Sequence, residues 1–378
     1  MKRSIITLAL VLVVALLTGC AGTPVVYYSD CTCPTGAHTE TIPQETDAAP
    51  VETIHPTESQ PLTAEGAVKT GVAILANAND SKSASTDANG ENVNGQADYD
   101  VSVVAVTVDD NGVITNCIID SIGTMVGFDN TGAVTTDLTA AIETKNELGE
   151  RYGMKAYAGS AYEWNEQAAA LAAYAVGKTL DELKNGAIDE TGYAADADLA
   201  TVATIALGGY VFAIENAVHN AQHLGAQVGD ELKLGIIPSV GSSTSADAEN
   251  EGLAQLDVDA VALTMQGGVI TSAQIDSVQA KVTFDASGTL TGGHDLPTGP
   301  FRTKNQLGEE YGMKLHAGSQ YEWNEQAASF AAYVTGKTPA EVAGIAVDEG
   351  TKPTDADLST SVTIAIGGFQ ALIAKACG

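Results

Sequence analysis

The sequence predicts an α+β fold made of two tandem repeats, each a small antiparallel sheet packed against helices. The phrase TKNELGERYGMK at residues 144–155 returns with two changes as TKNQLGEEYGMK at residues 303–314. Upstream of both copies, apolar residues alternate with period two around Gly-containing turns, which is typical of β-hairpins. Downstream, apolar residues follow helical spacing. A duplicated, mostly polar phrase within this shared order indicates that a whole folding unit is repeated.

The chain begins with the pattern of a secreted protein. Lys2 and Arg3 precede an apolar stretch at residues 5–17, and Leu-Thr-Gly-Cys ends at Cys20. This arrangement predicts a signal peptide over residues 1–19 and resembles a bacterial lipoprotein lipobox. The resemblance implies lipid on Cys20 and an extracytoplasmic protein anchored to the bacterial membrane.

Composition then separates a tether from the folded part. Residues 20–65 are rich in Thr, Pro, Glu, Asp and Ser, so we expect a disordered tether there. We expect repeat 1 over residues 66–222, a linker over residues 223–228 and repeat 2 over residues 229–378. The formal net charge of −31 repels phosphate backbones and argues against nucleic acid as a partner.

Each repeat opens with strand signals. Apolar residues alternate at 104–108 before an Asp-rich turn at residues 109–112, and at 261–265 before a Gly-Gly turn at residues 266–268. These patterns predict two hairpins with different turns. We expect the second strands to end near Ser121 and Ser277, and a third strand and bend to follow in each repeat.

Helix signals follow the duplicated phrase. The block YEWNEQAA occurs at residues 162–169 and again at residues 321–328, and apolar residues then continue at helical spacing. Gly177 and Gly336 suit left-handed helix ends. Thr179 and Thr338, each followed three residues later by Glu, predict capping boxes that start a second helix.

An Asp- and Thr-rich segment closes each repeat. One copy runs from Asp198 to Thr204 and the other from Asp357 to Thr363. A hydroxyl-rich turn at a helix N-terminus offers N–H groups to a phosphate. Alternatively, Asp198 and Asp357 are N-caps of the helices that follow.

The order of these parts resembles the FMN-binding domain of bacterial surface lipoproteins and of a subunit of sodium-pumping quinone reductases. The similar elements are Lys-x-Gly before a strand (Lys69 to Gly71), the hairpin sequence VTVDDNGVIT, and the closing segment. The family motif Asp-x-x-Ser-Gly-Ala-Thr is absent. The resemblance implies FMN as cofactor, with Thr204 and Thr363 on the phosphate side.

The duplicated phrase and the Trp block supply the remaining candidates for a binding pocket. Lys155, Lys314, Trp164 and Trp323 could line a pocket for a flavin or a small anionic ligand. Alternatively, the phrase is a structured loop whose apolar side chains pack on the sheet while its glycines adopt unusual dihedral angles.

These observations lead to two functional hypotheses. The first is a membrane-anchored lipoprotein with tandem FMN-binding-like domains that binds flavin or transfers electrons outside the cell. The second is a non-enzymatic surface protein with a ligand-binding or structural role. We assign no catalytic residue and no metal site, because no Ser-His-Asp, Cys-His or metal-ligand set is present in both repeats.

Overall fold

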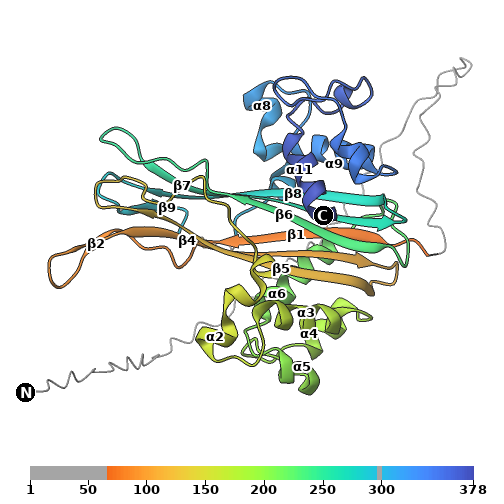
Figure 1. The fold of residues 1–378 in the computed structure, drawn as a ribbon, viewed down its shortest axis with the longest axis horizontal. Coiled ribbons are helices and arrows are strands. Elements are labelled where there is room, and N and C mark those ends of the chain that lie inside the picture. Colours follow the sequence, from red (N-terminus) through yellow and green to blue (C-terminus); the bar gives the residue numbers. More distant parts are fainter. Residues whose placement is uncertain (1–65, 296–299) are drawn as a thin grey trace, which may run out of the picture. The chain divides into compact units, whose positions relative to one another are not determined.

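The computed structural model describes residues 66–295 and 300–378, which belong to one compact unit. The predicted signal peptide, Cys20 and the tether lie outside the described residues. The fold is α+β, as predicted, with antiparallel sheets packed against helices (Figure 1). In the part that is described, no helix is both long and apolar enough to span a membrane.

Residues 66–222, the first half, contain a three-stranded antiparallel sheet with the order β1-β4-β5. A separate two-stranded ribbon pairs β2 with β3. The strands are β1 (Lys69–Asn77), β2 (Ser85–Thr86), β3 (Asn92–Val93), β4 (Gly95–Val108) and β5 (Ile114–Phe128).

Residues 229–378, the second half, contain a four-stranded antiparallel sheet with the order β6-β7-β8-β9. Its strands are β6 (Glu231–Ser239), β7 (Gly252–Gln266), β8 (Val269–Phe284) and β9 (Leu290–Gly292).

Both predicted hairpins are confirmed, but the predicted strand ends are wrong. β5 and β8 run through Ser121 and Ser277 without a break and end only at Phe128 and Phe284. A third strand follows the bend only in the second half, as the short β9. The polar Asp-Ser pair was interpreted as the end of each strand. In the structure its side chains are buried within the sheet, and the contacts that satisfy them are described below.

Helices follow each sheet in a matching order. The first half contains α1 (Lys145–Leu148), α2 (Met154–Ala158), α3 (Trp164–Ala175), α4 (Leu180–Gly186), α5 (Ala197–Val202) and α6 (Gly208–His219). The second half contains α7 (Lys304–Leu307), α8 (Met313–Ala317), α9 (Trp323–Val334), α10 (Pro339–Ala343) and α11 (Gly367–Cys377). Short 3-10 turns are η1 (Gly149–Tyr152), η2 (Gly308–Tyr311) and η3 (Leu358–Thr360).

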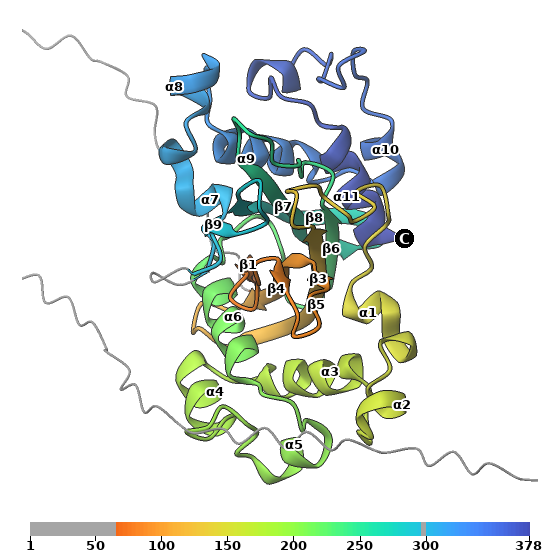
Figure 2. The same ribbon diagram turned by 90° about the vertical axis from the view of Figure 1, so that its left-hand side faces the viewer.

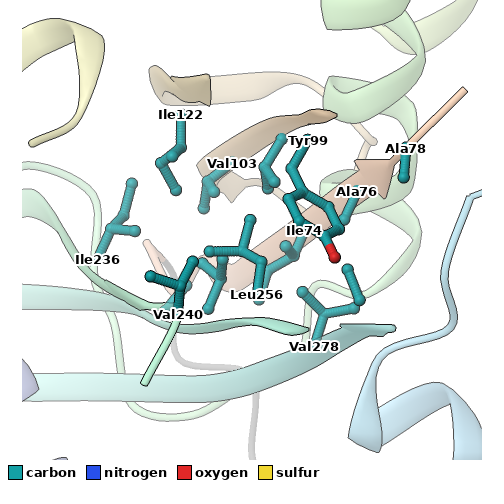
Figure 3. Close-up of a cluster of buried hydrophobic side chains, with 14 of the residues drawn as sticks. Ile74, Ala76, Ala78, Tyr99, Val103, Ile122, Ile236, Val240, Leu256 and Val278 are labelled. Atoms are coloured by element: carbon teal, nitrogen blue, oxygen red, sulfur yellow. The ribbon is translucent and has the colours of Figure 1, made fainter. Parts of the chain in front are cut away.

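The elements form four layers in the order helices, sheet, sheet, helices (Figures 1 and 2). One apolar core lies between the two sheets and includes Val103, Tyr99 and Leu256 (Figure 3). A second core joins the first sheet to α3–α6, and a third joins the second sheet to α9 and α11. Because both faces of each sheet are covered, β4 is apolar on both faces: Val103 faces the other sheet and Val104 faces the helices.

The glycines of Lys69-Thr-Gly71 and of the similar Lys233-Leu-Gly235 each let a helix pack directly on the strand. A Cβ atom on Gly71 would lie 2.0 Å from the carbonyl oxygen of Ala217 in α6. One on Gly235 would lie 2.6 Å from the carbonyl oxygen of Leu372 in α11. Any larger residue would push the helix away from the sheet.

The two halves share the central core and are linked by direct contacts. Phe128 and Phe284 stack with ring centroids 4.0 Å apart, and the Tyr99 hydroxyl donates to the carbonyl of Ala254 at 2.7 Å. Loops also exchange backbone hydrogen bonds, for example Ala84 N–H to the Gly288 carbonyl at 2.8 Å. The division into one domain over residues 66–222 and another over residues 229–378 stays a prediction.

Candidate functional site

The duplicated phrase starts with a helix that is fastened to the sheet. Thr144 and Glu147 form a capping box. The Asn146 side chain donates to the carbonyl of Ile119 at 2.9 Å, and its backbone N–H donates to the Asp120 carboxylate at 3.0 Å. In the second half, Asn305 makes the same two bonds to Ile275 and Asp276. The buried Asp therefore joins strand to helix, which explains why it interrupts neither β5 nor β8.

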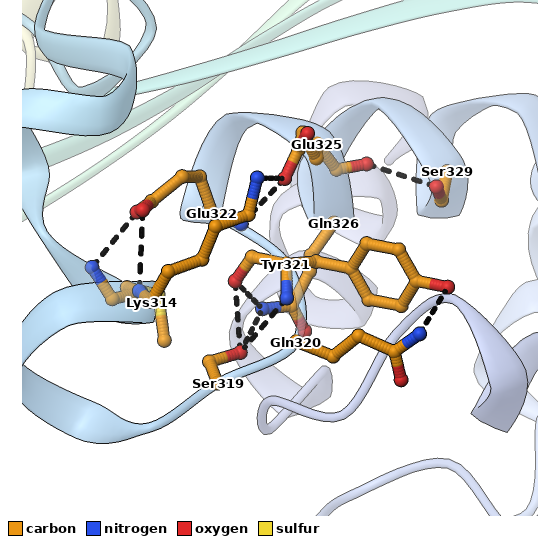
Figure 4. Close-up of polar contacts among 9 residues, drawn as sticks. Lys314, Ser319, Gln320, Tyr321, Glu322, Glu325, Gln326 and Ser329 are labelled. Atoms are coloured by element: carbon orange, nitrogen blue, oxygen red, sulfur yellow. Dashed lines mark hydrogen bonds and ion pairs between the residues drawn. The ribbon is translucent and has the colours of Figure 1, made fainter.

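The lysines that the sequence placed in a pocket are held by carboxylates. Lys155 Nζ lies 2.6 Å from Glu166, and Lys314 Nζ lies 2.8 Å from Glu325. Their backbone N–H groups are also bonded, Lys314 to the buried carboxylate of Glu322 at 3.1 Å (Figure 4). Each cation thus has a partner within its own half.

The tryptophans are core residues. Trp164 is 2% exposed and donates its indole N–H to the Tyr210 hydroxyl at 3.0 Å. Trp323 is 7% exposed and packs edge-on against Phe369. Lys145 and Lys304 stand over the tryptophan rings at 5.3 and 4.8 Å, consistent with cation–π contacts.

The two threonines expected on the phosphate side bind a buried glutamine. The oxygen Oε1 of Gln167 accepts from Thr204 N at 2.7 Å, Thr204 Oγ1 at 3.2 Å and Ile205 N at 3.1 Å. Gln326 binds the Thr363 segment in the same way. Its amide nitrogen donates to Ser319 and Tyr321 (Figure 4). These glutamines fasten the closing segment to the Trp-bearing helix.

The capping side chain lies two residues before each predicted N-cap. Asp196 caps α5 through hydrogen bonds from the backbone N–H groups of Asp198 and Leu199, both at 3.0 Å. Asp355 receives the equivalent bonds in the second half. The prediction of Asp198 as an N-cap is therefore wrong, whereas Asp357 does occupy the N-cap position of η3 but accepts no capping hydrogen bond through its side chain. The repeated Asp-x-Asp offers two candidates, and the first has the extended backbone that a cap needs.

The asparagine of the Trp-Asn-Glu-Gln block makes no structural hydrogen bond through its side-chain oxygen. Only four buried side-chain nitrogen or oxygen atoms of the described chain lack a hydrogen-bond partner, and two are Oδ1 of Asn165 and Oδ1 of Asn324. They occupy the same place in the two halves, at the second residue of α3 and of α9. A buried carbonyl oxygen without a partner costs about 1–3 kcal/mol. Its occurrence in both halves favours a functional reason.

Asn324 lines a cavity of about 620 Å³, which we call the larger cavity. It lies between α9, β8, and the segment of residues 220–224 that follows α6. Its walls combine small apolar side chains such as Ala328 and Ala331 with six amides. These amides are Asn220, Gln222, Gln274, Asn305, Gln306 and Asn324.

Two of the amides are fixed by hydrogen bonds, and those of Gln274 cross between the halves. Gln274 accepts the backbone N–H of Val72 at 2.6 Å and donates to the Asn220 carbonyl at 2.8 Å. Asn220 donates its side-chain amide to the Val72 carbonyl at 2.9 Å. At Val72 the outer edge of β1 is therefore bonded to side-chain amides, and the wall they form is preorganised.

The larger cavity contains one carboxyl group and no Lys or Arg among its described lining residues. Burial raises the pKa of Asp276 from 3.8 to about 6, against the hydrogen bonds that it accepts from Thr303, Ser277 and Asn305. His223 at the rim is hydrogen-bonded to Asp110 at 2.8 Å. The cavity is therefore polar, with a field that disfavours anions.

Comparisons of the chain with protein-family models, with curated proteins and with solved structures found no match. The site must therefore be interpreted from its own chemistry. The sequence had drawn attention to the Trp block, but to its Trp rather than its Asn. The repetition of Asn165 and Asn324 was visible, but the lack of a partner depends on three-dimensional contacts. Comparison of the two repeats did not predict the contribution of residues 220–224 to the cavity either. These residues span the end of predicted repeat 1 and the start of the predicted linker at residue 223.

Proposed function

We propose that this chain is a non-enzymatic ligand-binding protein that holds a small, uncharged polar molecule in the larger cavity. The observation that carries the proposal is the buried, unpartnered Oδ1 of Asn324 at the cavity wall. A volume of about 620 Å³ lies within the usual range of small-molecule sites. Apolar walls with a few fixed amides are also typical of such sites.

The polar groups of the cavity favour a ligand without a negative charge. No described Lys or Arg lines it, and Asp276 would repel an anion. Asp276 already receives hydrogen bonds from two backbone N–H groups and a hydroxyl. An amide, a lactam or a polyol could donate to the Asn324 oxygen while its remaining surface packs on the alanines.

The cellular setting that we propose follows from the chain's first residues. The lipobox-like sequence ending at Cys20 supports lipid anchoring, with the ligand-binding unit displayed outside the cytoplasm. Labelling of intact cells with a membrane-impermeant reagent tests the display. Loss of membrane association in Cys20→Ser tests the anchor.

Binding is tested with a library of small amides, lactams and polyols, with carboxylates and phosphates as anionic comparisons. Ligand-observed NMR on the purified protein identifies binders, and Asn324→Leu then shows whether they use the larger cavity. Asn165→Leu is the matched control, because the same change is made at the equivalent place in the other half. Binding of uncharged members that is lost only in Asn324→Leu supports the proposal; a library with no binders contradicts it.

Flavin binding stays a prediction supported by the sequence resemblance. Thr204 and Thr363 are exposed enough to meet a ligand, but each is already bonded to a buried glutamine. Absorption spectra after incubation with FMN and desalting, from cells able to attach flavin, test this second function. Flavin retained by the wild type, in an amount that falls in Thr204→Ala or Thr363→Ala, would support this function. A colourless protein would exclude it.

A further inference from the structure

The edge strand β1 of the first sheet is paired by a later part of the chain. Thr70 and Gln222 exchange two backbone hydrogen bonds, at 2.9 and 3.0 Å. Nearby, Val68 N–H donates to the Ala226 carbonyl at 3.0 Å. The bridges formed here are antiparallel, so residues 222–227 run along the outer edge of β1 as an added strand. We call residues 220–228 the added segment.

The edge strand β6 occupies the place of β1 in the second sheet, and it has no such partner. Within the described residues, the backbone of Glu231–Ser239 pairs with β7 alone. Alternate residues of an antiparallel strand direct their N–H and C=O groups to opposite sides. Every second residue of β6 therefore points these groups away from β7, at an open edge.

Comparison with Thr70 shows which residues of β6 point outward. Thr70 lies opposite Thr107 in β4, and Leu232 lies opposite Thr264 in β7. Thr107 and Thr264 occupy equivalent places, because each hydroxyl is bonded to a threonine of the next strand, at 2.6 and 2.7 Å. Leu232 thus stands at the place of Thr70, and it points its backbone groups outward together with the alternate residues that follow it.

The outward row of β6 consists of Leu232, Leu234 and Ile236. Leu232 and Ile236 are only 7% and 3% exposed, because their side chains belong to the central core, which holds the strand in place. Pro238 has no N–H and ends the row, which is a usual protection of an edge strand. Three N–H groups before it remain able to pair with another strand.

A second, smaller cavity of about 310 Å³ lies on the first half, beside β5. It is the counterpart of the larger cavity, because it is formed by the equivalent strand β5 and helix α3, and Asn165 lines it at the place of Asn324. Ala172 and Val176 are among its apolar lining residues. The described lining residues all belong to the first half.

The added segment forms one wall of the larger cavity, to which it contributes Gln222 and Leu224. β6 contacts β5 in the first half as β1 contacts β8 in the second. A strand added to β6 would therefore have the same relation to the smaller cavity. It would place one of its alternate side chains against Ala172 and Val176.

The added segment also indicates which peptide chemistry fits such an edge. Its sequence is NAQHLGAQV, which contains small and amide side chains and no Lys, Arg, Asp or Glu. The formal net charge of −31 repels acidic peptides from the whole chain. An extended peptide with small, uncharged residues and without acidic flanks matches both observations.

From these observations we infer that the outer edge of β6 is a docking site for an extended peptide segment of another protein. The peptide adds to the second sheet as an antiparallel strand and seats one apolar side chain on the smaller cavity. In binding by strand addition, backbone hydrogen bonds give affinity and side-chain pockets give specificity. Neither Asn324 nor the larger cavity takes part, so the inference does not depend on the proposed function.

The test uses a synthetic peptide of residues 220–228 with blocked ends, added to the purified ¹⁵N-labelled protein. We expect hydrogen exchange of the Leu232, Leu234 and Ile236 amides to slow at least about tenfold at saturation, because their N–H groups gain acceptors.

The matched control is the same peptide with N-methyl groups at the positions of Gln222 and Val228, whose N–H groups donate to the β1 side. It should bind at least about tenfold more weakly, and this comparison requires no change to the protein. Leu234→Pro removes an outward N–H without removing a bond to β7, so it should fold and also weaken binding of the unmethylated peptide.

Unchanged exchange at β6 in the presence of excess peptide would overturn the inference, as would equal binding of the methylated and unmethylated peptides. Changes confined to Val68 and Thr70 would show that the peptide replaces the added segment on β1, which equally contradicts a site on β6. Protection at β6 that is present without peptide and lost on dilution would assign the edge to a second copy of this chain and overturn the inference.

Discussion

The two cavities occupy equivalent places in the two halves but differ in size and polarity. The larger has a volume of about 620 Å³ and the smaller about 310 Å³. Both have the strand-to-helix clamp made by Asn146 or Asn305 and the unpartnered oxygen of Asn165 or Asn324. Shared residues therefore build the frame of each cavity, and other positions determine what the cavity can hold.

The differences come from strand residues and from an added wall. Ile118 in β5 packs against the central core, whereas Gln274 in β8 bonds to β1 and to Asn220. Residues 220–224 close one side of the larger cavity only. Two frames held by the same kinds of contact can thus present different sites when a few wall positions differ.

The largest predicted effect tests whether the frames are equivalent. Truncating the two buried glutamines removes six hydrogen bonds in the first half (Gln167→Ala) and five in the second (Gln326→Ala). We expect each variant to lower the free energy of unfolding by about 4 kcal/mol, because backbone N–H groups lose their acceptor. Chemical denaturation provides the measurement. If the two variants lose free energy of unfolding by amounts that differ by more than about 2 kcal/mol, the frames are not equivalent.

The next effect depends on pH and concerns Asp276. Its folded pKa of about 6 is above its ordinary 3.8, so the folded state binds more protons between these values. The carboxyl therefore lowers stability increasingly as pH rises through this window, by up to about 3 kcal/mol above it.

Asp276→Asn should remove this dependence. The stability of the wild type relative to the variant should fall between pH 4 and pH 7, as measured by denaturation at each pH. The stability of the wild type relative to Asp120→Asn, in the first half, should also fall as pH rises, because burial also raises the pKa of Asp120. A difference that rises with pH would contradict the raised pKa.

A smaller effect tests the contact between the halves. Gln274→Ile leaves the Val72 N–H and the Asn220 carbonyl without their partner, so we expect a loss of about 2 kcal/mol. The matched change Ile118→Val in the first half keeps an apolar contact and should cost about 1 kcal/mol. Equal losses in thermal or chemical denaturation would show that the amide bonds of Gln274 contribute little.

The smallest predicted effect concerns the asparagines themselves. Asn165 Oδ1 and Asn324 Oδ1 have no partner in the described structure, so replacing either residue by Leu removes a cost instead of a contact. We expect both variants to unfold within about 1 kcal/mol of the wild type, or to be more stable. A loss clearly above this for either variant would reveal a structural role and weaken the case for a binding site.

Much of the frame was predictable because it depends on local rules. Alternating apolar residues indicated the hairpins, and Thr179 and Thr338 indicated capping boxes that the structure contains. The predicted strand ends at Ser121 and Ser277 were wrong, since the buried carboxylates beside them accept hydrogen bonds from helices distant in sequence: Asp120 from Asn146, and Asp276 from Asn305. The cap at Asp196 was missed because two Asp residues fit the same local pattern.

The cavities could not be predicted in this way. Lys155, Trp164 and Thr204 were reasonable pocket candidates by residue type, yet each is engaged within its own half. Asn324 is important because its Oδ1 has no hydrogen-bond partner among the described residues, and no sequence pattern predicts such an absence. Only the arrangement of β1, β8 and residues 220–224 shows that a wall closes around it.

The most direct test of the central claim is a binding titration of the best uncharged library member with the wild type, Asn324→Leu and Asn165→Leu. The claim predicts that Asn324→Leu loses at least about tenfold in affinity, about 1.4 kcal/mol, while Asn165→Leu binds as the wild type does. Equal affinity for the wild type and Asn324→Leu would contradict the assignment of the larger cavity as the ligand site.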